Sequence, residues 1–251
     1  MNVRITIVYM DPHSEKSTFE LSRRRALLLG GSAALIGLTD FFMPNSAEAA
    51  SAGADISHGA RSRHEVALTF HGGGELAIAH KILAIAKKTH TPITVLAVGT
   101  WLNANPAIGK DIISAGHELG NHTFSHKTMT LLSLKEATAE VAKGKVALMK
   151  SVGSAGKYFR PSGTIKSNAM IRRAAGASGY AHCLSYDVDA MDYQASSGQE
   201  IVTTCMKAVQ NGSIIGLHFG YAHTVTALPL LIQALHAKKL IPVTVTQLLR
   251  P

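Results

Sequence analysis

The sequence predicts an α/β domain whose parallel strands form either a barrel or a doubly wound sheet. Short apolar segments typical of strands alternate with amphipathic segments typical of helices from residue 65 to the C-terminus. This part of the chain contains no internal repeat and no low-complexity stretch. A helix that follows each strand must cross over to reach the next one, and such units build parallel sheets.

The expected strands are short runs of β-branched and large apolar residues bounded by polar or glycine-containing segments. In the first of them, alternation of Val66, Leu68 and Phe70 marks one buried face. We expect strands at residues 65–70, 93–98, 117–121, 158–160, 181–188, 213–218 and 241–245.

The expected helices show an apolar stripe and begin at recognisable capping residues. Ser133 with Glu136 three residues later forms a capping box, and Ser167 is a second serine cap. Pro229 is compatible with a first helical turn. We expect helices at residues 76–88, 106–115, 133–150, 167–175, 200–210 and 228–237.

Residues 1–49 have the features of a twin-arginine signal peptide. The pair Arg23 and Arg24 precedes an apolar stretch, and small residues at Ala47 and Ala49 fit a cleavage site. The apolar stretch is interrupted and falls short of the roughly 20 residues that span a bilayer. We therefore expect cleavage after Ala49, no stable membrane anchor, and a product that is secreted or resides in the cell envelope.

Residues 50–64 are rich in Ala, Gly and Ser, and we expect a flexible linker before a domain at residues 65–251. The net charge of +9 suits an anionic envelope polymer. No basic run is present, so we expect no nucleic-acid partner, and we expect a monomer. Cys183 and Cys205 are compatible with a disulfide or with two buried thiols.

His122 and His126 are the first candidates for a functional site. They are four residues apart, and in a helical turn this spacing would place both rings on one face. Two neutral imidazoles in that arrangement suit zinc or a similar divalent metal.

The other candidates also follow predicted strands. His71 comes after the first strand, Arg160 after the fourth, Asp189 and Asp192 after the fifth, and His218 after the sixth. The carboxyl ends of parallel strands meet on one face of an α/β barrel, so these residues are expected to converge with the histidine pair.

Residues 65–250 resemble the polysaccharide deacetylases, the NodB-homology domain of carbohydrate esterase family four. The resemblance runs through five motifs in order, at residues 66–73, 116–126, 159–163, 189–193 and 213–218. It implies a distorted (β/α)7 barrel. It also implies a secreted metal-dependent hydrolase of non-peptide carbon–nitrogen bonds, acting on N-acetyl groups of peptidoglycan or chitin-like glycans.

The resemblance also implies a role for each candidate residue. An Asp together with His122 and His126 would hold a divalent metal, zinc by expectation, while a second Asp would deprotonate water. His218 would protonate the leaving amine with Asp192 as its partner, and Arg160 would be the cation near the base. The remaining residues, expected to contact substrate, are Tyr193, Asp189 and Pro161.

The first motif departs from the family pattern, because the two aspartates of Thr-Phe-Asp-Asp-Gly are His71 and Gly72 here. In one interpretation His71 is a third metal ligand. In another, Arg160 and the metal lower the pKa of His71, so that it acts as the catalytic base. In a third, the domain is a catalytically inactive protein that binds glycan.

Overall fold

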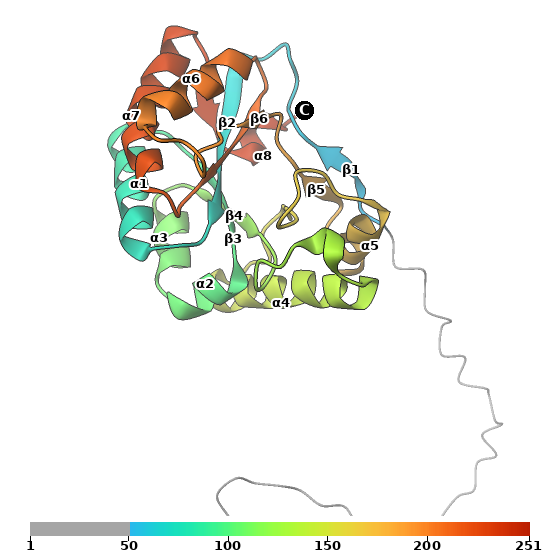
Figure 1. The fold of residues 1–251 in the computed structure, drawn as a ribbon. Coiled ribbons are helices and arrows are strands. Elements are labelled where there is room, and N and C mark those ends of the chain that lie inside the picture. The colour runs from blue at the N-terminus through green and yellow to red at the C-terminus, as the bar shows by residue number, and fades with distance from the viewer. Residues whose placement is uncertain (1–50) are drawn as a thin grey trace, which may run out of the picture. The chain divides into compact units, whose positions relative to one another are not determined.

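The computed structural model describes residues 51–251, and its main sheet has six strands that pair in parallel (Figure 1). The strand order is β4-β3-β2-β7-β6, and β8 pairs with the start of β2. The strands are β2 (Glu65–Gly72), β3 (Thr94–Ala97), β4 (Glu118–Asn121), β6 (Val188–Asp189), β7 (Ile214–His218) and β8 (Ile241–Val243). This arrangement confirms the predicted α/β class.

A second, two-stranded sheet pairs β1 (Gly53–Ile56) with β5 (His182–Leu184). Phe159 bridges Asn121 at the end of β4 to Cys183 in β5, so the predicted strand at 158–160 is reduced to a single bridging residue. The predicted strand at 181–188 is interrupted. Its first part, β5, faces Phe159, and its last residue begins β6, which pairs with β7. The strands thereby follow a curved path, as expected for a distorted barrel.

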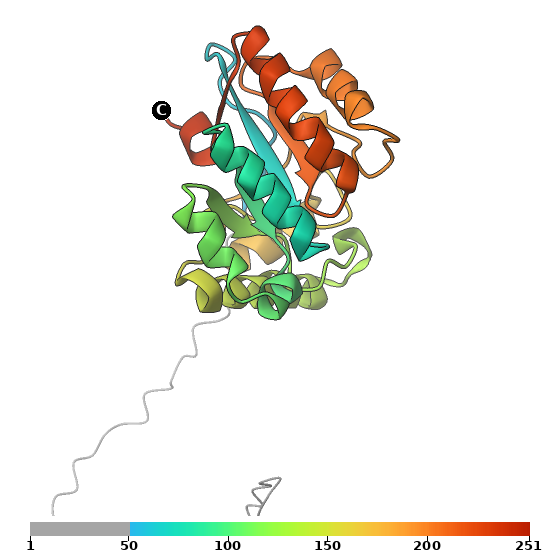
Figure 2. The ribbon, with the colours of Figure 1, turned by 90° about the vertical axis from the view of Figure 1, so that its left-hand side faces the viewer.

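Eight α-helices of the described region flank the strands. Figure 2 shows α1 and α7 side by side across one face of β2. The helices are α1 (Leu76–Lys88), α2 (Gly99–Ala104), α3 (Ile108–Ser114), α4 (Leu134–Val152), α5 (Ala169–Ala177), α6 (Gly198–Ala208), α7 (Ala222–Ala237) and α8 (Val245–Leu248). No helix within residues 51–251 combines the length and apolar character that a membrane span requires.

The side-chain alternation of β2 separates the core from the site. Val66, Leu68 and Phe70 are fully buried in the cluster formed with α1 and α7, and each such side chain contributes about 1.5–3 kcal/mol by leaving water. Ala67 points to the opposite face of β2 and packs in a separate interior cluster. His71 shares that interior face by its position in the strand, which directs its ring toward the site rather than the core.

The prediction of a flexible linker at residues 50–64 is wrong over Gly53–Ile56, which form β1. The segment has no apolar period, but its backbone pairs with β5, and the carboxylate of Asp55 accepts hydrogen bonds from the backbone N–H and hydroxyl of Ser167. The ordered domain therefore begins before residue 65. The predicted signal peptide, residues 1–49, lies outside the described residues.

Three helix predictions also need correction. The short helix α2 was not predicted, because six residues show too little periodicity. Helix α7 begins at Ala222, so Pro229 lies inside it rather than in its first turn. Asn168 caps α5 through a bond from the Ile171 N–H (2.9 Å), because Ser167 is already held by Asp55.

Cys183 and Cys205 are two separate buried thiols. They pack in different hydrophobic clusters, Cys183 with α5 and Cys205 with α6 and α7. Burial raises the pKa of Cys183 to about 11 and that of Cys205 to about 12, so both thiols are protonated at neutral pH.

Candidate functional site

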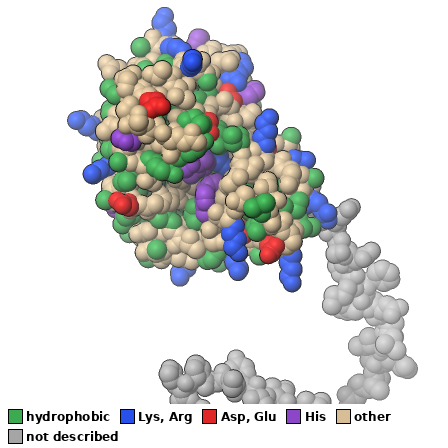
Figure 3. All heavy atoms as spheres, in the orientation of Figure 1, with side chains coloured by type: hydrophobic (Ala, Val, Ile, Leu, Met, Phe, Trp, Pro, Cys, Tyr) green, Lys and Arg blue, Asp and Glu red, His purple; other side chains and the backbone are tan. Residues whose placement is uncertain are grey.

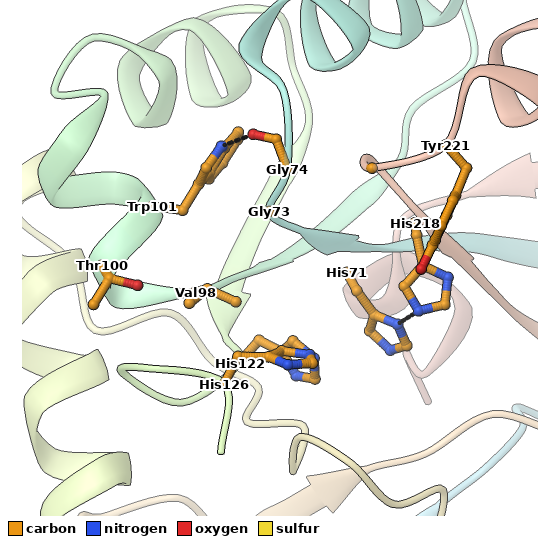
Figure 4. A pocket seen from close by; sticks show the side chains of 11 residues that line it. His71, Gly73, Gly74, Val98, Thr100, Trp101, His122, His126, His218 and Tyr221 are labelled. Carbon is orange, nitrogen blue, oxygen red and sulfur yellow. Dashed lines mark hydrogen bonds between the residues drawn. The ribbon is translucent and has the colours of Figure 1, made fainter. Parts of the chain in front are cut away.

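Four histidines line a cavity of about 590 Å³ at the carboxyl ends of β2, β4 and β7. They are His71, His122, His126 and His218. Figure 3 shows histidine side chains gathered in a hollow of this face, and Figure 4 shows the rings of His71 and His218 next to each other with those of His122 and His126 beside them. The structure therefore confirms the convergence expected from the sequence.

A continuous hydrogen-bonded chain joins Arg160, His71, His218 and Asp192. The guanidinium of Arg160 can only donate, so its Nη1 donates to Nε2 of His71 (3.2 Å). Nδ1 of His71 must then carry the ring proton, which it donates to Nε2 of His218 (2.7 Å). Nδ1 of His218 in turn donates to the Asp192 carboxylate (2.7 Å). The partners at the two ends thus set the tautomers of both histidines.

The Asp192 carboxylate is buried and fully engaged. Besides the ring of His218, it accepts the backbone N–H of His218 (2.8 Å) and the hydroxyl of Thr224 (2.7 Å). Three donors hold the carboxylate in place, and they come from the end of β7 and the first turn of α7. His218 is therefore fixed in the orientation that a proton-transferring imidazole needs.

His122 and His126 lie on a loop, so the prediction that they share a helical face is wrong. Residues 122–128 form no helix, and both Thr123 (φ 68°) and His126 (φ 57°) adopt the left-handed backbone region. The two rings nevertheless meet edge to face, with centroids 4.9 Å apart. Such backbone conformations cost about 1–3 kcal/mol per residue and persist only where surrounding contacts fix them.

Those contacts come from β4 and α4. The side chain of Asn121 accepts the Thr123 N–H (2.9 Å), and the Glu140 carboxylate accepts the N–H (2.8 Å) and hydroxyl (2.7 Å) of Ser125. Helix α4 approaches the loop so closely that a Cβ at Gly144 would lie 2.3 Å from the side-chain oxygen of Asn121. The loop is therefore held by buried hydrogen bonds that the spacing of the histidines does not reveal.

The residues that line the cavity do not form a complete zinc site. Nδ1 of His122 donates to the Arg160 carbonyl (3.0 Å), which leaves Nε2 as a possible ligand, but His71 uses both of its ring nitrogens. The rings of His71 and His122 stack with planes 9° apart and centroids 4.5 Å apart. A lone pair lies in the plane of its ring, so parallel rings cannot direct two lone pairs at one ion.

No other group completes the ligand set. Within residues 51–251, no cluster of three His, Cys, Asp or Glu side chains could hold a metal ion. At Gly72, where the family has an aspartate, a Cβ would lie 2.8 Å from Cγ1 of Val95 and 3.1 Å from Cα of Ala97. The prediction of His71 as a third ligand is therefore wrong for this arrangement, and the expected zinc is left with His122 and His126 alone.

Burial governs the ionisation of the site. Desolvation, then the neighbouring His122 and Arg160, hold the pKa of His71 well below its usual range. Desolvation, then His126, lower the pKa of His122 in the same way. Desolvation also lowers the pKa of Arg160 to about 10, so its guanidinium stays charged at neutral pH. His71 is thus a neutral imidazole beside a cation, and its donor role leaves no free lone pair for a base.

Arg160 is fixed from the barrel interior. Its side chain is fully buried, and it donates to the carbonyls of Leu184 (3.3 Å) and Ser185 (3.0 Å). The guanidinium carbon also lies over the Tyr186 ring, 5.0 Å from the centroid. These contacts leave Nη1 directed at His71, as the prediction of a cation near that position requires.

The predicted substrate contacts fall into two groups. Tyr193 is 40% exposed, and its ring stands edge-on to His218 with centroids 5.6 Å apart. Asp189 accepts the N–H of Met191 (3.0 Å) and the hydroxyl of Tyr193 (3.3 Å), so it positions the same segment. Pro161 is buried and does not line the cavity, so the prediction that it contacts substrate is wrong.

Tyr221 and Trp101 are not among the site residues predicted from the sequence. Tyr221 is 39% exposed and, like Tyr193, stands edge-on to His218, with centroids 5.5 Å apart. Trp101 lies on the unpredicted helix α2 and lines the cavity. An aromatic residue three positions after the fifth-motif histidine was the available signal for Tyr221.

The fold and the five ordered motifs define the class of protein. The sequence profile of the polysaccharide deacetylases matches residues 58–182. A solved T48 deacetylase with substrate is 30% identical, with a TM-score of 0.67 over 74% of this chain and 91% of that chain. The chain belongs to the polysaccharide deacetylase family, as its motifs predicted.

Two further similarities indicate the range of activities within this family. The peptidoglycan-N-acetylglucosamine deacetylase of Bacillus cereus is 29% identical over 189 residues, which cover 74% of this chain and 88% of the relative. A mutant of a family-four pseudoenzyme with restored enzymatic activity is 25% identical, with a TM-score of 0.73 over 78% of this chain and 71% of that chain. The fold is thus shared by an enzyme and by a protein described as a pseudoenzyme.

Proposed function

We propose that the domain hydrolyses N-acyl groups, acetyl among them, on amino sugars of an envelope glycan, peptidoglycan or a chitin-like polymer. The observation that carries this proposal is the chain from Arg160 through His71 and His218 to Asp192. It holds a proton-transferring histidine and a neutral hydrogen-bond donor next to each other, at one side of a cavity of suitable size.

In this hydrogen-bonded chain, His71 is neither a base nor a metal ligand but a hydrogen-bond donor. A substrate carbonyl oxygen that accepts the Nδ1–H of His71 would replace Nε2 of His218 as its partner. Neutral imidazoles beside a positive group are good donors to a developing oxyanion. The Nε2 atom of His218 would then be free to take a proton from the attacking water. His218 would later return that proton to the amine as the carbon–nitrogen bond breaks.

The experiment is an assay for free amine on acetylated chitooligosaccharides and peptidoglycan fragments, with residues 50–251 and with their His71→Ala and His218→Ala variants. We expect amine release that survives treatment with a chelator and is lost in both variants. Activity lost on chelation and regained with zinc would show that His122 and His126 recruit an ion with some further ligand. That result would overturn the scheme.

The second candidate is a catalytically inactive protein that binds glycan. It is favoured by Gly72, which removes a carboxylate of the family pattern, and by the incomplete ligand set around His122 and His126. It predicts that glycan fragments bind without any amine release, and that His218→Ala leaves the affinity within about threefold.

Export is part of the proposal. The twin arginines and the small residues before Ala50 support a product released outside the cytoplasm, where envelope glycans are accessible. Mass spectrometry of the exported protein is expected to find Ala50 as the first residue. An intact N-terminus in that fraction would contradict this part.

A further inference from the structure

The histidine-lined cavity has a second side that the proposed reaction does not use. Besides the histidines it is lined by apolar residues, which we call the apolar wall and define as Gly73, Gly74, Val98, Trp101 and Gly220. Figure 4 shows Trp101 across the cavity from His218. None of these residues has a charged or titratable side chain, and the hydroxyls among the cavity residues belong to Thr100 and Tyr221. The two sides of one cavity thus differ sharply in chemistry.

At two glycines of the apolar wall, a side chain would fit without a clash, so packing does not require glycine there. A Cβ at Gly73 would find Cγ2 of Val98 as its nearest neighbour at 3.8 Å, and one at Gly220 would find only the carbonyl oxygen of Gly73 at 3.9 Å. Gly74 differs, because its φ of 92° and a Cβ contact of 2.7 Å to Gly220 demand glycine. The missing side chains at Gly73 and Gly220 therefore enlarge the cavity.

The indole of Trp101 and the backbone N–H of Val98 are already hydrogen-bonded within the protein. The indole Nε1 of Trp101 donates to the Gly74 carbonyl (2.9 Å), and the ring packs edge-on to Phe219 with centroids 6.1 Å apart. The Val98 N–H donates to the Gly72 carbonyl (2.9 Å). The indole therefore has no donor left for a sugar hydroxyl, and a sugar ring placed here would lose hydrogen bonds to water.

The position of the wall relative to the reacting groups suggests its occupant. Tyr193 and Tyr221 are exposed beside His218, where a glycan polymer has room to extend. If the amino-sugar side of a carbonyl held at His71 and His218 is directed to these tyrosines, its acyl side extends toward Val98 and Trp101. The cavity of about 590 Å³ lies in the range that holds a whole drug-sized ligand, far more than an acetyl methyl fills.

We propose that the apolar wall receives the alkyl part of an N-acyl group longer than acetyl, so that the preferred ligand is an amino sugar with a short aliphatic acyl chain. This inference rests on the proposed function for the placement of the carbonyl. Each methylene that leaves water on this wall is expected to raise affinity roughly fourfold, until the chain fills the space.

The test measures binding, not turnover. Trp101 is the single tryptophan of the chain and lies in the wall, so its fluorescence reports occupancy directly. Titrations with N-acetyl-, N-butyryl- and N-hexanoylglucosamine are expected to give increasing affinity in that order. Equal affinity for all three, or the tightest binding for the acetyl compound, would overturn the inference.

Variants locate the effect. Gly73→Val fills the space beside Val98, Gly220→Val fills the space beside Gly73, and each is expected to abolish the increase with chain length. Two positions are used so that a folding defect in one variant does not decide the result. Ala77→Val places a valine on the exposed side of α1, away from the cavity, and is expected to retain the increase. An increase that survives in both glycine variants would place the chain elsewhere and overturn the proposal.

Failure of this inference can be told apart from failure of the proposed function. If affinity rises with chain length but no free amine is released from any of the three compounds, the hydrolytic proposal fails and the apolar wall still binds acyl chains. If amine is released and affinity does not depend on chain length, the inference is overturned and the proposed function stands.

Discussion

The strands that carry the site differ in how completely their carboxyl ends retain the family pattern. On the β7 side, His218 and Asp192 occupy the predicted positions, and three donors fix the carboxylate. On the side of β2 and β4, His122 and His126 are present, but His71 and Gly72 stand in place of two carboxylates. One side keeps the histidine–aspartate pair of the family pattern, and the other keeps two of its three expected metal ligands.

The difference shows how one strand end can change the chemistry of a site without changing the fold. His71 closes a hydrogen-bonded chain between Arg160 and His218, so the buried guanidinium has a partner although no carboxylate is present. An unpaired buried cation would be costly, and a neutral histidine that accepts from it reduces that cost. The substitution is thus compatible with the surroundings on the β7 side and incompatible with a three-ligand metal on the other.

The largest effect is expected from removing the proton-transfer group. His218→Ala should lower kcat by roughly 10²-fold to 10⁴-fold, because the proposed scheme uses Nε2 of His218 both to accept the proton of water and to return it to the leaving amine. His236→Ala, the same substitution at an exposed position on α7, serves as the control and should leave kcat unchanged. Steady-state kinetics on acetylated oligosaccharide measures both, and equal rates for the two variants would contradict the assignment.

The next prediction asks whether the β2 side can be returned to the family pattern. Gly72→Asp should lower the free energy of unfolding by about 1–3 kcal/mol, because its Cβ would lie 2.8 Å from Val95. Adding Val95→Ala should recover part of the loss. Chemical denaturation measures these changes, and zinc content measures whether His71→Asp together with the two other changes creates a metal site.

Gly73→Asp provides the matched control for that clash. It is the same substitution at the neighbouring glycine, where a Cβ has room. We expect it to change stability by less than Gly72→Asp does. An equal loss in the two variants would show that the added charge, and not the contact with Val95, is responsible.

The pH dependence of stability should report on the buried histidines His71 and His122. Burial lowers the pKa of His71 and His122 in the folded state, whereas in the unfolded chain both titrate near about 6.5. The unfolded state therefore binds more protons as pH falls below about 6.5. Stability from these groups is complete above that pH and declines below it, by at most about 1.4 kcal/mol per pH unit for each histidine.

A substitution on the β4 side makes that dependence specific. His122→Gln should flatten the decline between about pH 7 and pH 5, because one group that binds a proton only on unfolding has been removed. His80→Gln, at an exposed position on α1, should leave the slope unchanged. Denaturation midpoints across this range measure it, and identical slopes in both variants would show that His122 does not contribute.

The sequence predicted best the features that depend on local residue patterns and on the order of the motifs. Strand alternation predicted the buried face of β2, and the order of the motifs predicted that His71, His122 and His218 converge. These features depend on residues close in sequence or on the rule that parallel strands end on one face. They carry over to the structure because neither depends on the exact path of a loop.

The features that the sequence did not reveal depend on distant partners. β1 is ordered by pairing with β5 and by Asp55, about a hundred residues from Ser167. The loop that carries His122 and His126 is not helical, because the side chains of Asn121 and Glu140 accept hydrogen bonds from its backbone N–H groups. A four-residue spacing describes a helix well, but it contains no information on such long-range hydrogen bonds.

The smallest effect is expected at the rim on the β7 side, where Tyr193 offers both a ring and a hydroxyl. Its hydroxyl makes only exposed bonds, to Asp189 (3.3 Å) and to the sulfur of Met191 (3.1 Å), so Tyr193→Phe should change stability by less than about 0.5 kcal/mol. The ring faces His218 and remains in the Phe variant, so glycan affinity should also be nearly unchanged. Tyr193→Ala removes the ring, and affinity for the oligosaccharide should fall by about 0.5–1.5 kcal/mol. Calorimetric titration with one oligosaccharide compares the two variants directly. If Phe loses as much affinity as Ala, the hydroxyl itself contacts substrate, and the β7 side then contributes chemistry beyond His218 and Asp192.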